Sequence, residues 1–555
     1  MKKHFKSGVP MIWITGGAVA ISLILVIGVL TLIAVRGLGH FWPAGLVQVE
    51  VTERDGEVIP VLGEVHDTES VARQLVADLG YEIPEDQPLV TRHKFKIGNR
   101  QEYGNDFRWF VAGDGLMSEW EYPENVVVLE RTEWGDFFAF PVRVLEAGEE
   151  VAVADDEALW HDIEARIARA GDFRKQIERL EKSEIGANSA AQERLRLQTR
   201  RLQRTGVPEG DPAYAEIEAE IASLIEAYEG IAARRSALLA EINRDTVVMR
   251  MVNDREVNVP FANIVRAHRP NMMNLGQKIG YYIESFRLFI FGYPREANTE
   301  GGIFPAIFGT VIMVILMSII VTPVGVLAAI YLREYAKQGP FVRFIRICVN
   351  NLAGVPSIVF GVFGVGFFVY FLGGNIDLLF FQDALPAPTF GTPGLFWASL
   401  TLALLTLPVV IVSTEEGLTR IPRSIREGSL ALGATKAETL WKVIVPMSAP
   451  AMMTGLILAV ARAAGEVAPL MLVGVVKLAP NLPIDGNAPY IHLERQFMHL
   501  GFHIYDVGFQ SPNVDAARPL VYATALALVV IIVVLNLTAI MIRNRLREKY
   551  KSDSD

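Results

Sequence analysis

The sequence predicts a polytopic α-helical membrane protein with six transmembrane helices and an extracytoplasmic insert of α+β type. Apolar residues gather in runs of ~20 residues, the length that crosses the hydrocarbon core of a bilayer. Charged residues concentrate in one long polar stretch between the first and second of these runs. Of the 555 residues, 51% are hydrophobic and 21% are charged, a mixture that indicates membrane spans joined to a large polar domain.

The composition excludes several other classes of protein. A chain that is half hydrophobic cannot be intrinsically disordered. Its only cysteine, Cys348, excludes a disulfide scaffold. The net charge of −10 argues against nucleic acid as the partner.

The first apolar run is Pro10–Val35, and it follows the basic start Met1–Lys6. The alternative interpretation is a cleaved signal peptide. However, the run is longer than the ~7–15 apolar residues of such a peptide, and no clear small-residue cleavage site follows it. We therefore predict an uncleaved anchor, so that residues 1–36 form an N-terminal cytoplasmic tail and the first transmembrane helix.

Five further spans are predicted in residues 301–555. They are Phe304–Leu332, Leu352–Leu372, Pro393–Ser413, Met447–Val476 and Leu520–Ile542. Lys and Arg are abundant in the connections after the second and fourth spans and beyond the sixth, whereas Gly373–Thr392, between the third and fourth, has none. Since cytoplasmic connections carry the excess of Lys and Arg, both termini are expected in the cytoplasm and the insert outside.

The insert covers residues 37–300. Short alternating runs broken by turn residues predict antiparallel strands over 45–155 and 246–268. Residues 157–242 instead show helical spacing, interrupted by two prolines and two glycines at Thr205–Pro212. This pattern predicts an antiparallel helical hairpin or coiled coil inserted into a small β domain. Its scattered histidines lack metal-ligand spacing, so neither a metal site nor a cofactor is expected.

The connection at 414–446 contains the most specific pattern in the chain. Glu427 is followed by Gly433 six positions later and by Pro446 thirteen positions after that. Such a pattern predicts two short helices around a turn, because glycine adopts backbone geometries that other residues resist. Pro446 is expected to end the second helix, and Glu427 to meet a basic patch of a partner protein. The alternative is an ordinary amphipathic loop.

The same stretch can be compared with a nucleotide-binding loop. That motif needs Lys and then Ser or Thr directly after its second glycine, whereas Ala434 follows Gly433. We therefore expect no catalytic residues and no ATP hydrolysis by this chain. The energy for any transport has to come from a separate ATPase subunit.

Arg462 and Glu466 lie in the predicted fifth span, at positions i and i+4 that share a helix face. An unpaired charge at bilayer depth costs at least ~2.5–3.5 kcal/mol, so such residues normally line a bundle interior or a water-filled path. A guanidinium also donates parallel hydrogen bonds to tetrahedral oxyanions. The pair is therefore our candidate for a substrate path. The alternative is a structural ion pair that fixes helix packing.

With these residues the sequence resembles the PstA-type permeases of bacterial phosphate ABC importers. The connection matches their coupling motif E-A-A-x3-G-x9-I-x-L-P, with Gly428-Ser429 in place of two alanines and valines at 443 and 445. Further support comes from Gly302–Thr310, Ala329–Ala336, Val355–Gly361 and Ala461–Leu470.

The resemblance implies a type I ABC importer permease in the bacterial inner membrane, with both termini cytoplasmic and the insert periplasmic. It also implies a PstC-like second permease, a PstB-like ATPase dimer and a PstS-like extracytoplasmic phosphate-binding protein. The path for phosphate would lie between the two permeases, and the family implicates an arginine at the position of Arg462. A further arginine of some members is absent, because Val412 stands at its position.

Two alternatives to phosphate transport stay open on sequence alone. The first is a permease for another oxyanion such as sulfate, molybdate or phosphonate, because one guanidinium does not discriminate among them. The second is an envelope sensor or scaffold that acts through the insert. A scaffold, however, needs neither the motif at 414–446 nor Arg462 among the apolar spans.

Overall fold

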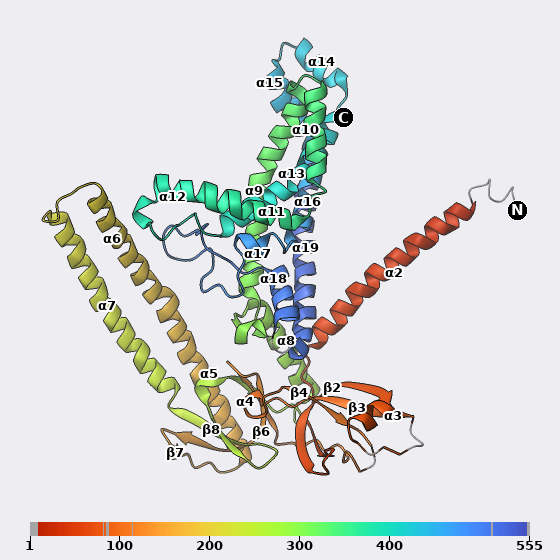
Figure 1. The fold of residues 1–555 in the computed structure, drawn as a ribbon, viewed down its shortest axis with the longest axis vertical. Helices are drawn as coiled ribbons and strands as arrows, with labels where there is room; N and C mark the ends of the chain where they lie inside the picture. Colours follow the sequence, from red (N-terminus) through yellow and green to blue (C-terminus); the bar gives the residue numbers. More distant parts are fainter. Residues whose placement is uncertain (1–8, 82, 85–87, 114, 512–513, 552–555) are drawn as a thin grey trace.

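The structure is a computed structural model that describes residues 9–81, 83–84, 88–113, 115–511 and 514–551 (Figure 1). The molecule is elongated, with two β-sheets at one end and a bundle of long helices extending from them. The basic start Met1–Lys6 lies outside the described residues.

Six helices are long and apolar enough to cross a membrane, as predicted. They are Met11–Gly39, Phe304–Tyr335, Ser357–Phe380, Leu395–Arg420, Lys436–Ala464 and Ala516–Arg545. The third begins at Ser357 instead of Leu352, because Val355 precedes Pro356 and such a residue avoids the helical conformation. The fifth ends at Ala464 instead of Val476, and the chain turns at Gly465.

The helical region from residue 304 onward has further breaks within these spans. Its helices are α9 (Phe304–Ile330), α10 (Pro340–Leu352), α11 (Ser357–Phe363), α12 (Gly374–Phe380), α13 (Leu395–Arg420), α14 (Arg423–Ala431), α15 (Lys436–Thr439), α16 (Val445–Ala464), α17 (Leu470–Val473), α18 (Leu500–Tyr505) and α19 (Val514–Lys551). Wider π-helical turns join several of them: η4 (Tyr331–Tyr335), η5 (Gly364–Gly373), η7 (Leu440–Ile444) and η8 (Asp506–Gln510). The 3-10 turn η6 (Gln382–Ala384) follows α12.

Helix α13 is the centre of the bundle. In the apolar stretch of α13, 67% of the residues are buried, whereas in the apolar stretch of α2 (Val9–Gly39) none is buried. Helices α9 and α16 approach α13 closely through glycines. A Cβ on Gly325 would lie 2.6 Å from Val410 Cγ1, and one on Gly455 would lie 2.7 Å from Ser413 Cβ. These two positions therefore require glycine for the observed packing.

Two helical elements leave the bundle. The third span, from α11 to α12, runs across the long axis of the bundle (Figure 1). Helix α2 contacts α19 near Gly37, where a Cβ would lie 2.9 Å from the carbonyl oxygen of Tyr522, and then extends away from it. An apolar helix whose side chains are exposed along most of its length is suited to contact with lipid.

The insert contains antiparallel strands, as predicted, and they form two larger sheets and the small two-stranded sheet β11-β12. The first has the order β1-β2-β3-β4, with β1 (Val47–Thr52), β2 (Val58–Ala72), β3 (Leu89–Lys96) and β4 (Phe107–Val111). The second has the order β10-β5-β6-β8-β9, with β5 (Val127–Arg131), β6 (Asp136–Glu146), β8 (Asp245–Arg250), β9 (Glu256–Pro260) and β10 (Ile264–His268). The short β7 (Glu149–Glu150) pairs with β6. Alternate residues Val47, Val49 and Val51 are buried, as one-sided strands require.

Smaller elements complete the insert. They are α3 (Arg73–Asp78), α4 (Arg100–Tyr103), η2 (Phe261–Asn263), α8 (Leu275–Phe291), β11 (Pro294–Arg295), η3 (Glu296–Asn298) and β12 (Glu300–Gly301). The sequence analysis did not predict α8. Its signal was a capping box in which Asn274 accepts a hydrogen bond from the backbone of Gln277 at 2.9 Å, and the Gln277 side chain accepts one from the backbone of Asn274.

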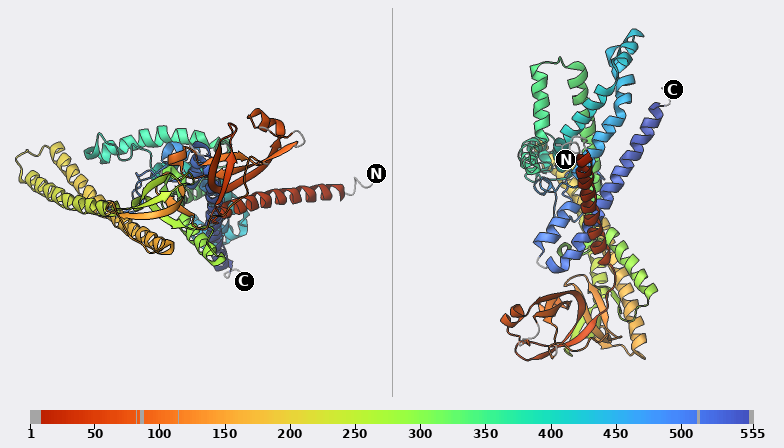
Figure 2. Two further views of the ribbon diagram at one scale, coloured as in Figure 1. Left: turned by 90° about the horizontal axis from the view of Figure 1, so that it is seen from below. Right: turned by 90° about the vertical axis from the view of Figure 1, so that its right-hand side faces the viewer.

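A helical hairpin projects from the second sheet. One arm consists of α5 (Asp156–Arg179), η1 (Leu180–Ile185) and α6 (Gly186–Arg204), and the other is α7 (Pro212–Ile242). The hairpin and α2 extend to opposite sides of the bundle (Figures 1 and 2). Near the hairpin tip, Arg204 donates hydrogen bonds to Asp383 at 2.8 Å and to Gln382 at 2.7 Å, both in η6. The hairpin therefore spans from the sheet to the connection between α12 and α13.

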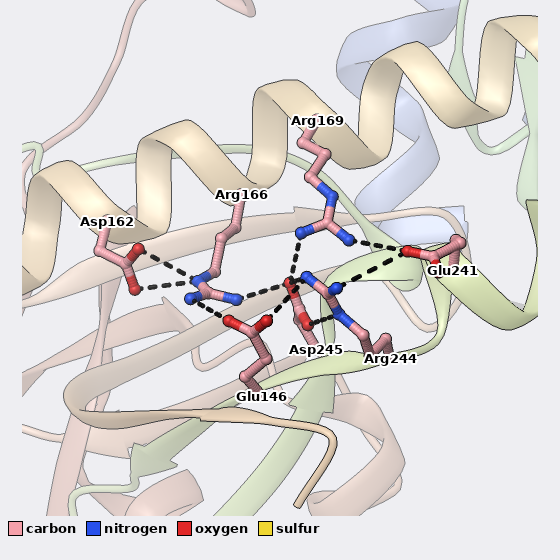
Figure 3. A network of polar contacts seen from close by, with 7 residues as sticks. All are labelled: Glu146, Asp162, Arg166, Arg169, Glu241, Arg244 and Asp245. Carbon is pink, nitrogen blue, oxygen red and sulfur yellow. Dashed lines mark hydrogen bonds and ion pairs between the residues drawn. The ribbon is translucent and has the colours of Figure 1, made fainter. Parts of the chain in front are cut away.

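A network of arginines and carboxylates fixes the base of the hairpin (Figure 3). Asp245 on β8 is buried and lies 2.6 Å from Arg166, 2.8 Å from Arg244 and 3.3 Å from Arg169. Burial alone would raise the pKa of Asp245, but hydrogen bonds from Arg244 and Arg166 hold it below its ordinary value. One carboxylate thus ties both arms of the hairpin to the sheet.

Replacing Asp245 with Ala should loosen the hairpin, because Arg166 would keep a largely buried charge with one partner fewer. Breaking a buried pair from one side costs about 3–5 kcal/mol. Hydrogen exchange of residues 156–242 in the full chain should therefore accelerate. Asp172→Ala on α5 is the matched control, because Asp172 is exposed and its one ion pair within the described residues is with the exposed Lys175. Equal exchange in both variants would contradict the role of the network.

Candidate functional site

The predicted site residues form two separate groups. Arg462 and Glu466 lie at the end of α16, near the middle of the molecule, whereas Glu427 and Gly433 lie in the short helices at the end opposite the sheets (Figure 1). Pro446 lies at the start of α16, which leads from one group to the other. The structure therefore separates the two groups by the length of α16 and does not bring them into a single cluster.

Arg462 and Glu466 form an ion pair, with Arg462 Nε 3.5 Å from Glu466 Oε1. The sequence analysis expected the two residues to lie on one helix, and this expectation was wrong. Arg462 occupies the last turn of α16, Gly465 caps that helix, and the Glu466 N–H donates to the carbonyl of Ala463 at 3.2 Å. The helix ends at Gly465, whose φ of −95° is open to any residue, and Pro469 follows before the short α17 begins.

This helix end is fixed by close packing on two sides. Ala463 and Ala464 are fully buried in the core shared with α13 and α9. On the other side α11 crosses the break, because a Cβ on Gly361 would lie 2.7 Å from the Cα of Pro469. A Cβ on Gly465 would meet no neighbouring helix, so the close packing at this end depends on the two alanines.

The guanidinium of Arg462 remains available for a ligand. Its side chain is 35% exposed, and that of Glu466 is 19% exposed. Among the described residues Glu466 is the only ionic partner of Arg462. The 3.5 Å between Arg462 Nε and Glu466 Oε1 is too long for a well-formed hydrogen bond. The geometry therefore leaves the N–H fork free to bind an oxyanion.

Gly433 forms the turn between α14 and α15. Its φ is +88°, in the left-handed region that favours glycine. The Gly433 N–H donates to the carbonyl of Leu430 at 3.0 Å, and the Ala434 N–H donates to that of Ser429 at 3.3 Å. These two bonds form a Schellman motif, which satisfies the last carbonyls of α14. The next helix begins with a capping box between Thr435 and Glu438.

Pro446 does not end the second helix, contrary to the prediction. Helical structure continues without a gap from Lys436 to Ala464. The π-helical turn η7 directly precedes Pro446, which falls in the first turn of α16. A proline lacks its N–H and its ring clashes with the carbonyl of residue i−4 in a regular helix. The wider π turn is the local departure from regular helix geometry that accompanies this proline.

The sequence analysis missed the residues that hold this helical pair against the bundle. Arg426 donates to Glu334 Oε1 at 2.9 Å, and both side chains are largely buried. The Lys436 ammonium donates to the backbone carbonyl of Glu334 at 2.6 Å and lies 4.8 Å from the ring of Tyr335. Glu334 and Tyr335 belong to Ala329–Ala336, one of the stretches that resemble the family. No local pattern there indicates a contact with residues about 100 positions later.

The exposed surface of the helical pair is both acidic and apolar. Glu427 is exposed on α14. Leu432, just before the turn, is 91% exposed, and Trp441 after α15 is more than half exposed. An exposed leucine and tryptophan beside a carboxylate at the tip of a rigid turn are typical of a protein interface.

The chain is similar to known membrane transport proteins over its helical region. The profile of the family described as binding-protein-dependent transport system inner membrane component matches residues 321–551. The phosphate transport system permease protein PstA of Mycobacterium leprae is 37% identical over 188 residues, which are 34% of this chain and 56% of that protein. Phosphate transport system permease protein PstA 1 of Mycobacterium tuberculosis is 32% identical over 244 residues, which are 44% of this chain and 71% of that protein.

A third relative, the probable ABC transporter permease protein YqgI of Bacillus subtilis, is 29% identical over 245 residues, or 43% of this chain and 76% of that protein. The match to the Mycobacterium leprae protein thus spans little more than half of that protein's length. The two sheets and the hairpin lie outside the range of the family profile.

Replacing Arg426 with Met should detach the helical pair from η4. The substitution keeps the length of the side chain but leaves the largely buried Glu334 without its charged partner. Hydrogen bonds to charged groups contribute about 1.5–3 kcal/mol. Hydrogen exchange over residues 423–444 should accelerate accordingly. Glu334→Gln and the double variant complete a cycle, and additive effects of the two substitutions would contradict a direct interaction.

Proposed function

Since the chain belongs to the PstA-type permeases of binding-protein-dependent transport systems, we propose that it is the membrane permease subunit of an ATP-driven importer of inorganic phosphate. The observation that carries the proposal is the free guanidinium fork of Arg462 at the break after α16. An arginine among membrane helices is costly and normally marks a substrate path.

The geometry supports a simple exchange of partners during transport. In the structure Glu466 lies 3.5 Å from Arg462 and offsets its charge. An entering phosphate anion can accept two parallel hydrogen bonds from the guanidinium and replace the more distant carboxylate. Because Glu466 lies beyond the helix end, it can move without unwinding α16. Arg462 then binds the anion, and Glu466 neutralises the arginine again after release.

The partners follow from the same proposal. A PstC-like second permease would complete the path on the exposed side of Arg462. A PstB-like ATPase dimer would bind the surface formed by Glu427, Leu432 and the turn at Gly433. A PstS-like phosphate-binding protein would deliver the anion on the opposite side. The chain itself acts as a transport subunit, and ATP hydrolysis takes place in the ATPase.

The arrangement in the membrane is part of the proposal. Both termini would be cytoplasmic, and the sheets and hairpin periplasmic. The C-terminal end of α19 lies at the same end of the bundle as α14 and α15, and the sheets lie at the opposite end (Figures 1 and 2). This arrangement agrees with the distribution of Lys and Arg in the connections.

Uptake of labelled phosphate tests the role of Arg462. In a strain whose only phosphate importer is the one containing this chain, deletion should abolish uptake. The wild-type chain should restore it, and Arg462→Ala should restore less than about 1% at equal membrane abundance, because more than ~2.7 kcal/mol of anion binding is lost.

Arg420→Ala is the matched control, because Arg420 also ends a helix and has an acidic residue, Glu416, one turn before it. Full uptake by Arg462→Ala would reduce the Arg462–Glu466 pair to a structural contact. Phosphate uptake that survives deletion, or uptake of sulfate in its place, would refute phosphate as the substrate.

Gly433→Pro should uncouple ATP hydrolysis from transport in the reconstituted complex. Proline holds φ near −65° and cannot adopt the +88° of the turn, so the Schellman motif is lost. Gly433→Asn is the conservative control, because asparagine tolerates the left-handed region and no neighbouring atom lies within 4 Å of a Cβ there. Phosphate transport per ATP should fall with Pro and persist with Asn; equal ratios would contradict a coupling role.

A further inference from the structure

A polar cavity of about 700 Å³ lies where the insert meets the membrane helices. Its walls come from the end of α2, the start of α19, α8, the segment 295–301 and six strands of the two larger sheets. We call it the junction cavity. None of the site residues proposed above lines it, so the proposed transport path does not explain the residues of its walls.

The junction cavity is strongly charged but nearly neutral overall. Seven Lys or Arg and seven Asp or Glu residues line it. Lys96 and Asp136 form an ion pair at 2.5 Å, while Glu130 is shared by the guanidiniums of Arg266 and Arg295. Two guanidiniums on one carboxylate leave a local excess of positive charge at this wall.

Three buried polar atoms, two on the segment 295–301 and one on β10, have no hydrogen-bond partner within the described residues. They are Arg295 Nε, Glu300 Oε2 and His268 Nδ1, and all three residues line the cavity. His268 is only 9% exposed. A buried donor or acceptor without a partner destabilises the fold, because it has lost its hydrogen bonds to water. Each of the three atoms can donate a hydrogen bond, provided that the Glu300 carboxyl carries its proton.

The proton on Glu300 is explained by its surroundings. Burial, together with the nearby Asp136 and Glu130, raises the pKa of Glu300 to about 8, although Lys96 and Arg295 oppose the shift. Other charged groups that face Glu300 are Arg131 and, across Gly135, Asp106. At neutral pH Glu300 is therefore mostly protonated and adds no full negative charge beside the guanidiniums of Arg266 and Arg295.

The position of the cavity relates it to the membrane surface. Trp42 follows shortly after the first span, and its ring centroid lies 6.2 Å from that of Tyr282 on α8. Tryptophan and tyrosine are enriched at the boundary between a bilayer and water. Helix α8 buries Ser285 and Phe289 but exposes an apolar stripe of Leu275, Ile279, Ile283 and Phe286. An amphipathic helix of this kind lies in the membrane interface. The cavity is thus at the depth of lipid headgroups.

We propose that the junction cavity binds the phosphate group of an anionic phospholipid from the leaflet on the insert side. Arg295, Glu300 and His268 would donate hydrogen bonds to the phosphate oxygens, and its single charge would balance the positive excess. The acyl chains would lie against Leu32 and Val35 of α2 and Leu520 of α19, which are apolar lining residues from the first and last spans. The lipid would join the insert to the first and last spans.

Lipid retention by the full-length chain tests this proposal. The chain is exchanged into detergent from membranes containing phosphatidylglycerol, and the bound phospholipid per chain is measured by mass spectrometry. At pH 7 the wild type should retain one phosphatidylglycerol, and Arg295→Gln should reduce its affinity about tenfold or more, since one charge-assisted hydrogen bond is lost. Arg143→Gln is the control, because Arg143 pairs with Glu256 away from the cavity.

A pH comparison keeps the test decisive even if Arg295→Gln disturbs the fold. At pH 9 Glu300 is ionised, loses its donor hydrogen and repels the phosphate, so the wild type should release the lipid. Glu300→Gln keeps a donor and cannot ionise, so it should retain the lipid at both pH 7 and pH 9. His268 does not titrate in this interval, because burial lowers its pKa to about 4.

Three results would overturn the proposal. The first is retention of no phospholipid by the wild type at pH 7. The second is equal pH dependence in the wild type and Glu300→Gln. The third is thermal stabilisation of the chain by inorganic phosphate alone with no effect of phosphatidylglycerol, which would make the cavity a site for a free anion.

Discussion

A chain inside a bilayer has to pair its own backbone groups, because lipid offers no hydrogen bonds. This constraint determines where the helices from residue 304 onward can be interrupted. The break after Ala464 is covered by α11 on one side and α13 on the other. The chain after the break is thus packed against protein at Pro469 and Leu470, whereas Gly465 is exposed and Glu466 is partly buried. Arg462 ends its helix at this partly exposed position.

The two ends of α16 meet this constraint in different ways. At one end the π turn η7 joins the short helix α15 to α16 without ending the helix at Pro446. At the other end Gly465 closes it beside Arg462. A continuous helix from Lys436 to Ala464 thus connects the exposed turn at Gly433 with the candidate anion site. A displacement of the turn by a partner protein can reach Arg462 through one rigid element, in keeping with the proposed coupling.

The insert is joined to the bundle by polar contacts in the segment 294–301. Glu296 accepts a hydrogen bond from the Gly135 N–H at 2.8 Å, and Asn298 donates to the carbonyl of Lys477 at 2.8 Å. Lys477 in turn pairs with Asp506 at 3.2 Å. Together with the contact of Arg204 with Asp383, this gives the insert two separate attachments to the connections outside the spans. The junction cavity lies beside the first attachment.

The sequence by itself determined the six spans, the turn at Gly433 and the presence of a charged pair at Arg462. Each of these depends on local physics: the length of apolar runs, the backbone freedom of glycine and the cost of charge in lipid. Only the tertiary structure decided that Glu466 lies beyond the helix end, that Pro446 continues a helix, and that Glu334 holds Arg426. These outcomes depend on packing between segments as much as 100 residues apart, such as α11 against Pro469. No local pattern encodes such contacts, and for the same reason the junction cavity became visible only once the sheets met the membrane helices.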